Sequence, residues 1–345
     1  MLCQQHDGLN ETTMSSKNKH LLAALALALG LLSSCSHAPI PETQSSPAGS
    51  APWTHFMEKE EHERFLNLVE AYFLKENRVI QISDDTVYFP EEPDSPAFSL
   101  LNLAQSCHLE EQNEWPKLVL SHLRALDRAL VRDTPRSFED TREHILLRLI
   151  PDDTGAESPD IIQKVEIPGT KTLLVFDSSE AVIPLSKKMA LQAWNKTEEE
   201  LFALGEKNLL ALASPVLSDI TVGKGLNLKA VRGDSYFIAS LALILEAHPE
   251  WSGRHGLLFG IPTRDTILMY PIEDEGVLEA MNVLPTILAE LEKNGPGSVS
   301  KRVYFYRDKS IDSLAFQDNE GRLVMTQAKR FLKVLKELSD DKARN

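Results

Sequence analysis

The stretch YFIASLALILEA, residues 236–247, is apolar nearly all round. A helix without a polar face is buried on most of its sides, so we expect this stretch to form the central helix of the fold. Gly233 and Asp234 stand directly before it and predict a turn, in which Asp234 caps the free amides of the first helical turn. The remaining elements are therefore expected to pack around residues 236–247.

Short apolar runs on both sides of this stretch predict strands. Residues 172–176, TLLVF, end in Asp177 and predict a buried strand. Residues 257–261 and 266–270 flank the sequence PTRD and predict a hairpin. Further strands are predicted at residues 79–82, 86–89, 181–183, 226–231 and 302–306, with 98–103 as either a strand or a short helix.

Helical periodicity accounts for most of the other segments. Residues 54–76 place Phe65, Val69, Tyr72 and Phe73 on one face. The other predicted helices are residues 116–130, 138–150, 185–194, a helix after the capping box formed by Thr197 and Glu200, residues 275–293 and residues 324–338. This mixture predicts an α+β fold with a mixed, mostly antiparallel sheet and several helices around the buried central helix.

Composition excludes one class of partner. The 345 residues carry a net charge of −15, and an acidic surface repels the phosphates of nucleic acids and anionic lipids. We therefore expect no nucleic-acid partner. Of the three cysteines, at positions 3, 35 and 107, only Cys107 belongs to the expected folded part, so disulfides do not hold it together and Cys107 is expected to be a small buried side chain.

The N-terminal residues have the pattern of an export signal. Lys17 and Lys19 precede residues 21–32, LLAALALALGLL, a run too short to span a bilayer as a helix, which needs about 20 residues. Leu32, Ser33, Ser34 and Cys35 then fit a lipobox, in which Cys35 is acylated after cleavage and becomes the new N-terminus. Met14 is the better start, because residues 14–19 form a compact basic segment.

These patterns divide the chain into four parts. Residues 1–34 are a signal peptide, 35–53 a lipidated end and flexible tether rich in Pro, Ser and Ala, 54–160 an N-terminal α+β part, and 161–345 a C-terminal α+β part. Ser36 follows the cysteine, and this predicts an envelope lipoprotein anchored in the bilayer at the periplasmic face of the outer membrane. Several acyl chains hold a protein more firmly than one.

Four segments in order resemble the YtpQ-like family, also known as domain of unknown function 1444. They are LLVFD at residues 173–177, residues 200–212 with their Asn-Leu-Leu, GDSY at 233–236 with Ser240, and GIPTRD at 260–265. The resemblance covers roughly residues 54–310 and implies an α+β domain without implying a reaction. Family members carry a second aspartate in the GDSY segment, which here has become Ile238 or Ala239.

The polar residues in these motifs are the candidate site. They are Asp177, Asn208, Asp234, Tyr236, Ser240, Arg264 and Asp265. Strand and helix ends can converge on one edge of a sheet, which would bring these side chains into one binding site. Each also has a structural interpretation: Asp234 as a cap, Asn208 as a buried amide on backbone partners, Ser240 bonded to a carbonyl one turn earlier, Arg264 and Asp265 as turn residues, and Tyr236 in the core.

No reaction motif is present. The sequence lacks GxSxG, HExxH, paired CxxC and GxxxxGK, and its ten histidines show no ligand spacing, so we assign no catalytic residue, no metal and no cofactor. We favour a non-catalytic envelope module that binds another envelope protein or a peptide. The alternatives are a hydrolase-like enzyme that uses Asp177, Asp234, Arg264 and Asp265, and a carrier of a small ligand.

Overall fold

The computed structural model describes residues 56–83, 85–91, 98–132, 137–153, 160–178, 182–212, 215–223, 225–233, 235–295, 297–314, 316–319, 322–325 and 329–344. The predicted signal peptide and tether, including Leu32, Ser33, Ser34 and Cys35, lie outside these residues, and so does Asp234.

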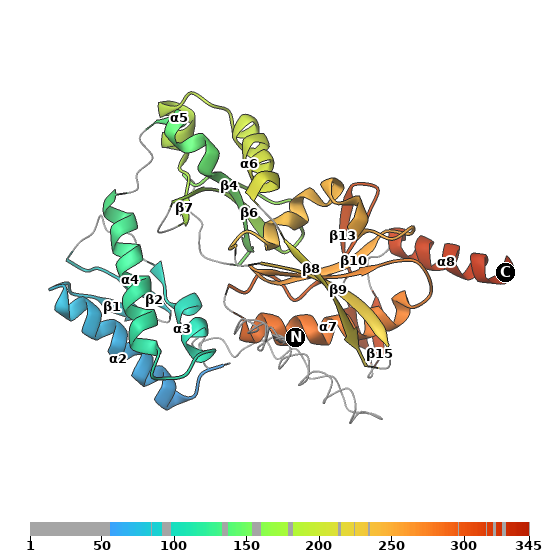
Figure 1. The fold of residues 1–345 in the computed structure, drawn as a ribbon, viewed down its shortest axis with the longest axis horizontal. Coiled ribbons are helices and arrows are strands. Elements are labelled where there is room, and N and C mark those ends of the chain that lie inside the picture. Colours follow the sequence, from blue (N-terminus) through green and yellow to red (C-terminus); the bar gives the residue numbers. More distant parts are fainter. Residues whose placement is uncertain are drawn as a thin grey trace, which may run out of the picture.

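The described residues form an α+β fold, as predicted (Figure 1). Its longer helices are α2 (Lys59–Lys75), α3 (Leu101–His108), α4 (Trp115–Arg132), α6 (Glu198–Leu212), α7 (Val277–Asn294) and α8 (Lys329–Arg344). Short helical turns are α5 (Phe138–Thr141), η2 (Arg142–His144), η3 (Lys188–Ala193), η4 (Ala239–Ala247) and η5 (Pro249–Trp251). The shorter strands are β1 (Gln81–Ser83), β2 (Thr86–Tyr88), β3 (Phe98–Ser99), β5 (Gln163–Lys164), β7 (Val182–Pro184), β14 (Phe316–Asn319) and β15 (Arg322–Met325). The longer strands are β4 (Ile145–Pro151), β6 (Thr170–Asp177), β8 (Val216–Val222), β9 (Leu226–Arg232), β10 (Leu257–Thr263), β11 (Thr266–Pro271), β12 (Val303–Arg307) and β13 (Ser310–Leu314).

Residues 56–132, the N-terminal module, have a hydrophobic core of their own. Helix α2 buries Phe65, Val69, Tyr72 and Phe73, so the predicted apolar face is confirmed. These side chains pack with residues of β2, α3 and α4, and Trp115 is among the largest fully buried side chains of the protein. Figure 1 shows α2, α3 and α4 gathered beside the rest of the molecule.

Cys107 lies in this core and has no exposed surface, as predicted. Burial raises the pKa of its thiol to about 12, and the thiolate is the form that reacts with alkylating agents. We expect iodoacetamide to label the Cys107 peptide of the native protein at least about 100-fold more slowly than the same peptide after unfolding, by mass spectrometry. An added surface cysteine, Ser121→Cys, is the control, and equal labelling of both sites in the native protein would contradict the burial.

The largest sheet has six antiparallel strands in the order β13-β12-β10-β11-β9-β8. One face carries α7 and α8, whose buried side chains include Leu284, Leu288 and Phe331. The opposite face, with Phe259 and Ile267, packs on η4. The predicted hairpin is confirmed as β10 and β11.

The stretch expected as the central helix is buried, but it is a 3-10 helix. In η4, Ala239, Ser240, Leu241 and Ala242 are all buried, and Ile244 has non-helical backbone angles. The helical residues begin at Ala239, three residues later than predicted. Tyr236 therefore lies in the turn before the helix and is 50% exposed, so its predicted core position is wrong.

A second sheet, order β4-β6-β5 with β7 also on β6, covers the other side of η4. Helix α6 packs on the far face of this sheet, above it in Figure 1. The capping box that begins α6 is confirmed: the Thr197 amide donates to Glu200 Oε2 at 2.9 Å, and the Glu200 amide donates to Thr197 Oγ1 at 3.1 Å.

The predicted helix at residues 138–150 is wrong beyond its first residues. Only α5 and η2 are helical, and residues 145–151 form β4, which pairs with β6 along its whole length. Six of these residues, ILLRLI, have no helical alternation of apolar and polar residues, and pairing with the apolar strand TLLVF overrides the helix propensity of leucine. The division expected at residue 160 falls between these two paired strands.

Several other segments differ from the prediction, and β5, β13 and β14 are strands where the sequence predicted none. Residues 324–338 were expected as one helix, but 322–325 form β15 and the helix α8 begins at Lys329. Strand β8 was not predicted, because as an edge strand it exposes Val216 and Leu217 and shows no clear alternation. The alternatives at residues 98–103 both hold in part, since β3 is followed directly by α3.

Candidate functional site

Two arginines from different elements lie close together between the sheets. Arg148 is in β4 opposite Leu173 of β6, and alternation along the strand places it on the same face as Leu146, toward η4. Arg264 is in the turn between β10 and β11. Its amide donates to the Gly297 carbonyl at 2.8 Å, and its carbonyl accepts from the Ala239 amide at 2.9 Å. The backbone of Arg264 is therefore fixed to both the central helix and the loop after α7.

The side chain of Arg264 is held from two directions. Its guanidinium lies over the ring of Tyr236, with 4.1 Å between the Cζ atom and the ring centroid, which is a cation–π contact. Its stem packs on Gly297, which has φ of 72° and where an added Cβ would come within 2.5 Å of Arg264 Cδ. The Nε atom of Arg264 is buried and has no hydrogen-bond partner among the described residues.

Neither arginine has a carboxylate within ion-pair distance in the part of the chain that the structure describes. Burial and the like charge of Arg264 lower the pKa of Arg148 to about 10, although Tyr236 and Asp177 raise it. Burial also lowers the pKa of Arg264, whereas Tyr236 and Asp265 raise it. Both guanidinium groups still carry their charge at neutral pH, so two positive charges lie close together in a poorly hydrated region between the sheets.

Asp177 is the acidic member of this group. It lies at the end of β6, as predicted, and is partly buried. Burial raises the pKa of its carboxyl, while the charges of His144 and Arg148 lower it. Its charge therefore offsets part of the positive charge of Arg148 from a distance, without an ion pair.

The N-terminal module reaches the same place. Gln105 of α3 donates from Nε2 to Ser298 Oγ at 3.1 Å and accepts from the Gly297 amide at 3.2 Å, and so it fixes the loop that supports Arg264. Burial and the charge of Arg264 lower the pKa of the imidazole of His122 in α4, and another part of this residue is exposed to solvent. We call Arg148, Arg264, Tyr236, Asp177 and His122 the arginine site.

Three predicted residues have structural roles. Asp265 Oδ1 accepts from the hydroxyls of Thr263 at 2.8 Å and Thr266 at 3.0 Å, as expected of a turn residue. Asn208 donates from Nδ2 to the carbonyls of Arg142 at 2.6 Å and Ile145 at 2.9 Å, so the predicted backbone partners are confirmed, while the side chain is only partly buried. These bonds join α6 to the start of β4.

Ser240 joins the central helix to β4. It is 1% exposed, and its Oγ accepts from the Leu149 amide at 3.1 Å, whereas the sequence predicted a bond to a carbonyl one turn earlier. The reason is that η4 packs directly on β4, so a partner across the contact is nearer than a bent bond within the helix.

Removing this hydroxyl should destabilise the fold. In Ser240→Ala the buried Leu149 amide loses its acceptor, and we expect a loss of about 1–3 kcal/mol in the free energy of unfolding, measured by urea denaturation. Ser121→Ala is the control, because Ser121 is exposed on α4. A loss for Ser240→Ala no larger than the control's would show that the bond adds no stability.

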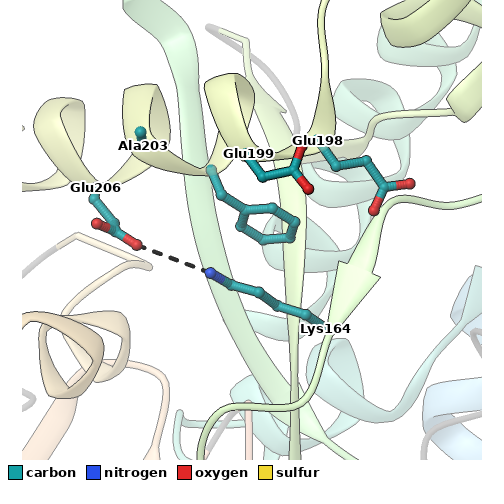
Figure 2. A pocket seen from close by; sticks show the side chains of 6 residues that line it. Lys164, Glu198, Glu199, Ala203 and Glu206 are labelled. Atoms are coloured by element: carbon teal, nitrogen blue, oxygen red, sulfur yellow. Dashed lines mark ion pairs between the residues drawn. The ribbon is translucent and has the colours of Figure 1, made fainter.

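A separate hollow of about 330 Å³ lies beside α6 and is lined by Lys164, Glu198, Glu199, Phe202, Ala203 and Glu206 (Figure 2). Lys164 Nζ is 4.1 Å from the Phe202 ring centroid, 2.9 Å from Glu166 Oε1 and 3.9 Å from Glu206 Oε1. Lys164, the one cation that lines this hollow, is therefore already paired with glutamates and with the Phe202 ring. The other charged residues of the lining are glutamates on an open surface, and they do not indicate a particular ligand.

Sequence reasoning missed Arg148 and His122. A single cation inside the apolar run ILLRLI was a usable signal for Arg148, but the segment was interpreted as a helix. His122 has no local signal, because its role depends on how the N-terminal module docks. Within the described residues, no three His, Cys, Asp or Glu side chains are placed to hold a metal ion.

No protein-family model matches the chain, and no curated protein or solved structure is detectably similar to it. The resemblance to the YtpQ-like family therefore depends on the four quoted motifs alone.

Proposed function

We propose that the folded part is a non-catalytic binding module, which takes an anionic group of an envelope protein or peptide at the arginine site. The observation that carries this proposal is that Arg148 and Arg264 lie together, largely buried, with no ion-pair partner among the described residues. The chain has 51 acidic residues, so a shortage of carboxylates does not explain why these two arginines have no ion-pair partner in the described part of the chain. Unpaired buried charge is costly and is typical of a functional site.

Titration with small anions tests this binding. We expect sodium acetate to raise the melting temperature of the protein in a saturable way, beyond the effect of sodium chloride at equal ionic strength. The shift should disappear in Arg148→Met and in Arg264→Met, and should persist in Arg142→Met, whose arginine lies on the surface. An equal response of all four proteins would refute the proposal.

The anchor is proposed from the lipobox pattern. We propose that Cys35 carries the acyl chains and that residues 36–53 tether the module at the periplasmic face of the outer membrane. None of the described helices is both long and apolar enough to cross a membrane. Mass spectrometry of the N-terminal peptide should find acylated Cys35, and Cys35→Ala should release the protein from the membrane fraction; an intact leader without acyl chains would refute the anchor.

One observation favours the alternative of a hydrolase-like enzyme. The raised pKa of Asp177, beside Arg148, is a property of general acids. Against this, Asp265 is engaged by two threonine hydroxyls and Ser240 by a backbone amide, so neither is a free nucleophile or base. Turnover of ester or amide substrates that is lost in Asp177→Asn would establish the alternative over simple binding.

The arginine site also predicts a pH dependence of anion binding. Burial and the charge of Arg264 both lower the pKa of His122, so a bound anion that offsets this charge should raise that pKa. Binding then takes up a proton, and the affinity should increase as the pH falls from 7.5 to 6, a range in which a carboxylate ligand stays ionised. Calorimetry should show a gain of about two- to fivefold in the wild type and none in His122→Gln; an affinity that falls with pH in the wild type would contradict the sign.

A further inference from the structure

We infer that the anionic group recognised at the arginine site is a single carboxylate rather than a phosphate. The inference rests on the proposed function, because it names the chemical class of the ligand of that site. Two features of the described residues support it: the charge balance of the site, and the shape of the surface that Arg264 and Tyr236 form together.

The charge balance favours a ligand with one negative charge. Arg148 and Arg264 contribute two positive charges, and Asp177 offsets one of them. Asp265 acts on Arg264 and also on Arg232, which ends β9 opposite Thr266. Burial lowers the pKa of Arg232 and the charge of Asp265 raises it, so the negative charge of Asp265 and the positive charge of Arg232 balance. One carboxylate therefore neutralises the site, whereas a phosphate monoester, with a charge of about −1.5 to −2 at pH 7, would leave excess negative charge beside Asp177.

The shape of the surface favours a planar anion attached to carbon. The guanidinium of Arg264 is a flat fork that matches two oxygens of a carboxylate or of a phosphate, so the choice between them depends on the Tyr236 ring and on the charge balance. The half-exposed ring of Tyr236 lies against it and offers an apolar surface to the carbon that bears the carboxylate. Because Gly297, Gln105 and the backbone of Ala239 hold this arginine and its loop in place, little ordering is needed on binding.

The buried Nε atom of Arg264, which has no acceptor among the described residues, adds a reason for this arginine to bind an anion. A buried donor without an acceptor costs about 1–3 kcal/mol. The half-exposed ring of Tyr236 covers one face of this guanidinium. A carboxylate oxygen bound beside the ring would supply the missing acceptor.

Isothermal titration of the whole folded chain with four probes tests the inference. The probes are N-acetyl-Ala-Ala as the free acid, its C-terminal amide, N-acetyl-Ala-Glu-amide and inorganic phosphate. We expect the free acid to bind at least about tenfold more tightly than its amide and than phosphate, as one charge-assisted bidentate contact allows. The glutamate probe separates the two sources of a carboxylate: tighter binding of the free acid indicates a chain end, and tighter binding of the glutamate probe indicates an acidic side chain.

Variants separate failure of the inference from failure of the proposed function. Arg264→Lys keeps the charge but not the fork, so it should lose most of the preference for the acid over the amide. Phosphate that binds more tightly than either carboxylate probe, and loses its affinity in Arg148→Met, would overturn the inference and leave anion binding standing. Binding of all probes that is unchanged in Arg148→Met and Arg264→Met would overturn both. Circular dichroism of each variant verifies that it is folded.

Discussion

Arg148→Met should raise the stability of the protein while it removes the affinity for anions. Arg148 lies on the apolar face of β4, next to a second buried arginine, with no ion pair among the described residues. Even buried ion pairs are often replaced by apolar side chains with a gain of about 1–4 kcal/mol, and here no described residue forms an ion pair with the charge to be removed. Methionine is close to the stem of arginine in length and adapts its shape, so the packing around β4 is kept.

The measurement is thermal and urea unfolding of three proteins at pH 7.5: the wild type, Arg148→Met and the surface control Arg142→Met. We expect the melting temperature of Arg148→Met to rise by several degrees and that of the control to change little, since surface substitutions stay within about 0.5 kcal/mol. A loss of stability in Arg148→Met would mean that the guanidinium is satisfied in the folded protein, and the central observation of the proposed function would fail.

The pH dependence of this gain follows from the pKa of Arg148. In the folded protein the pKa is lowered to about 10, so folding disfavours the charged form. The penalty is fully present at any pH below the folded pKa and is relieved only as the pH rises through it. The difference in the free energy of unfolding between Arg148→Met and the wild type should therefore be constant between pH 6 and pH 8. The one exception is the titration of Asp177, because the pKa of its carboxyl rises further when the charge of Arg148 is removed.

Local patterns predicted the parts of the fold that depend on one segment alone. The face of α2, the capping box of α6 and the hairpin of β10 and β11 each follow from periodicity or from a few residues at fixed spacing, and the structure confirms them. Each of these patterns works because the partner group lies within a turn or two of the chain.

The errors occur where the partner is distant. Residues 145–150 form a strand because residues 170–177 are available to pair with them, which the segment itself does not show. Tyr236 is exposed because the helix begins only at Ala239. For the same reason the sequence predicted only part of the candidate site. The motifs contained Arg264, Tyr236 and Asp177, but Arg148 and His122 join them only through packing between elements.

The pairing of β4 also predicts a strong coupling between two residues that the sequence does not connect. Gly205 of α6 faces β4, where an added Cβ would lie 2.8 Å from Leu147 Cδ2. Leu147 is fully buried in the same core cluster. We expect Leu147→Ala to cost about 2–5 kcal/mol, because it leaves a cavity under the helix, and Gly205→Leu to cost about 1–3 kcal/mol by overpacking.

The double variant should be more stable than the sum of the two losses predicts. In Leu147→Ala with Gly205→Leu, the new leucine enters the space that the old one leaves, so we expect a favourable coupling of about 1–3 kcal/mol in urea unfolding. Gly205→Leu also removes a glycine from the helix interior, which by itself stabilises the helix by up to about 1 kcal/mol. The variant Ala203→Gly, at an exposed position of the same helix, measures the size of this helix-propensity contribution. Losses that simply add would mean that α6 and β4 do not touch at these residues. Because Leu147 faces Gly205 only if residues 145–151 are a strand paired with β6, the same cycle tests the element that the sequence predicted wrongly.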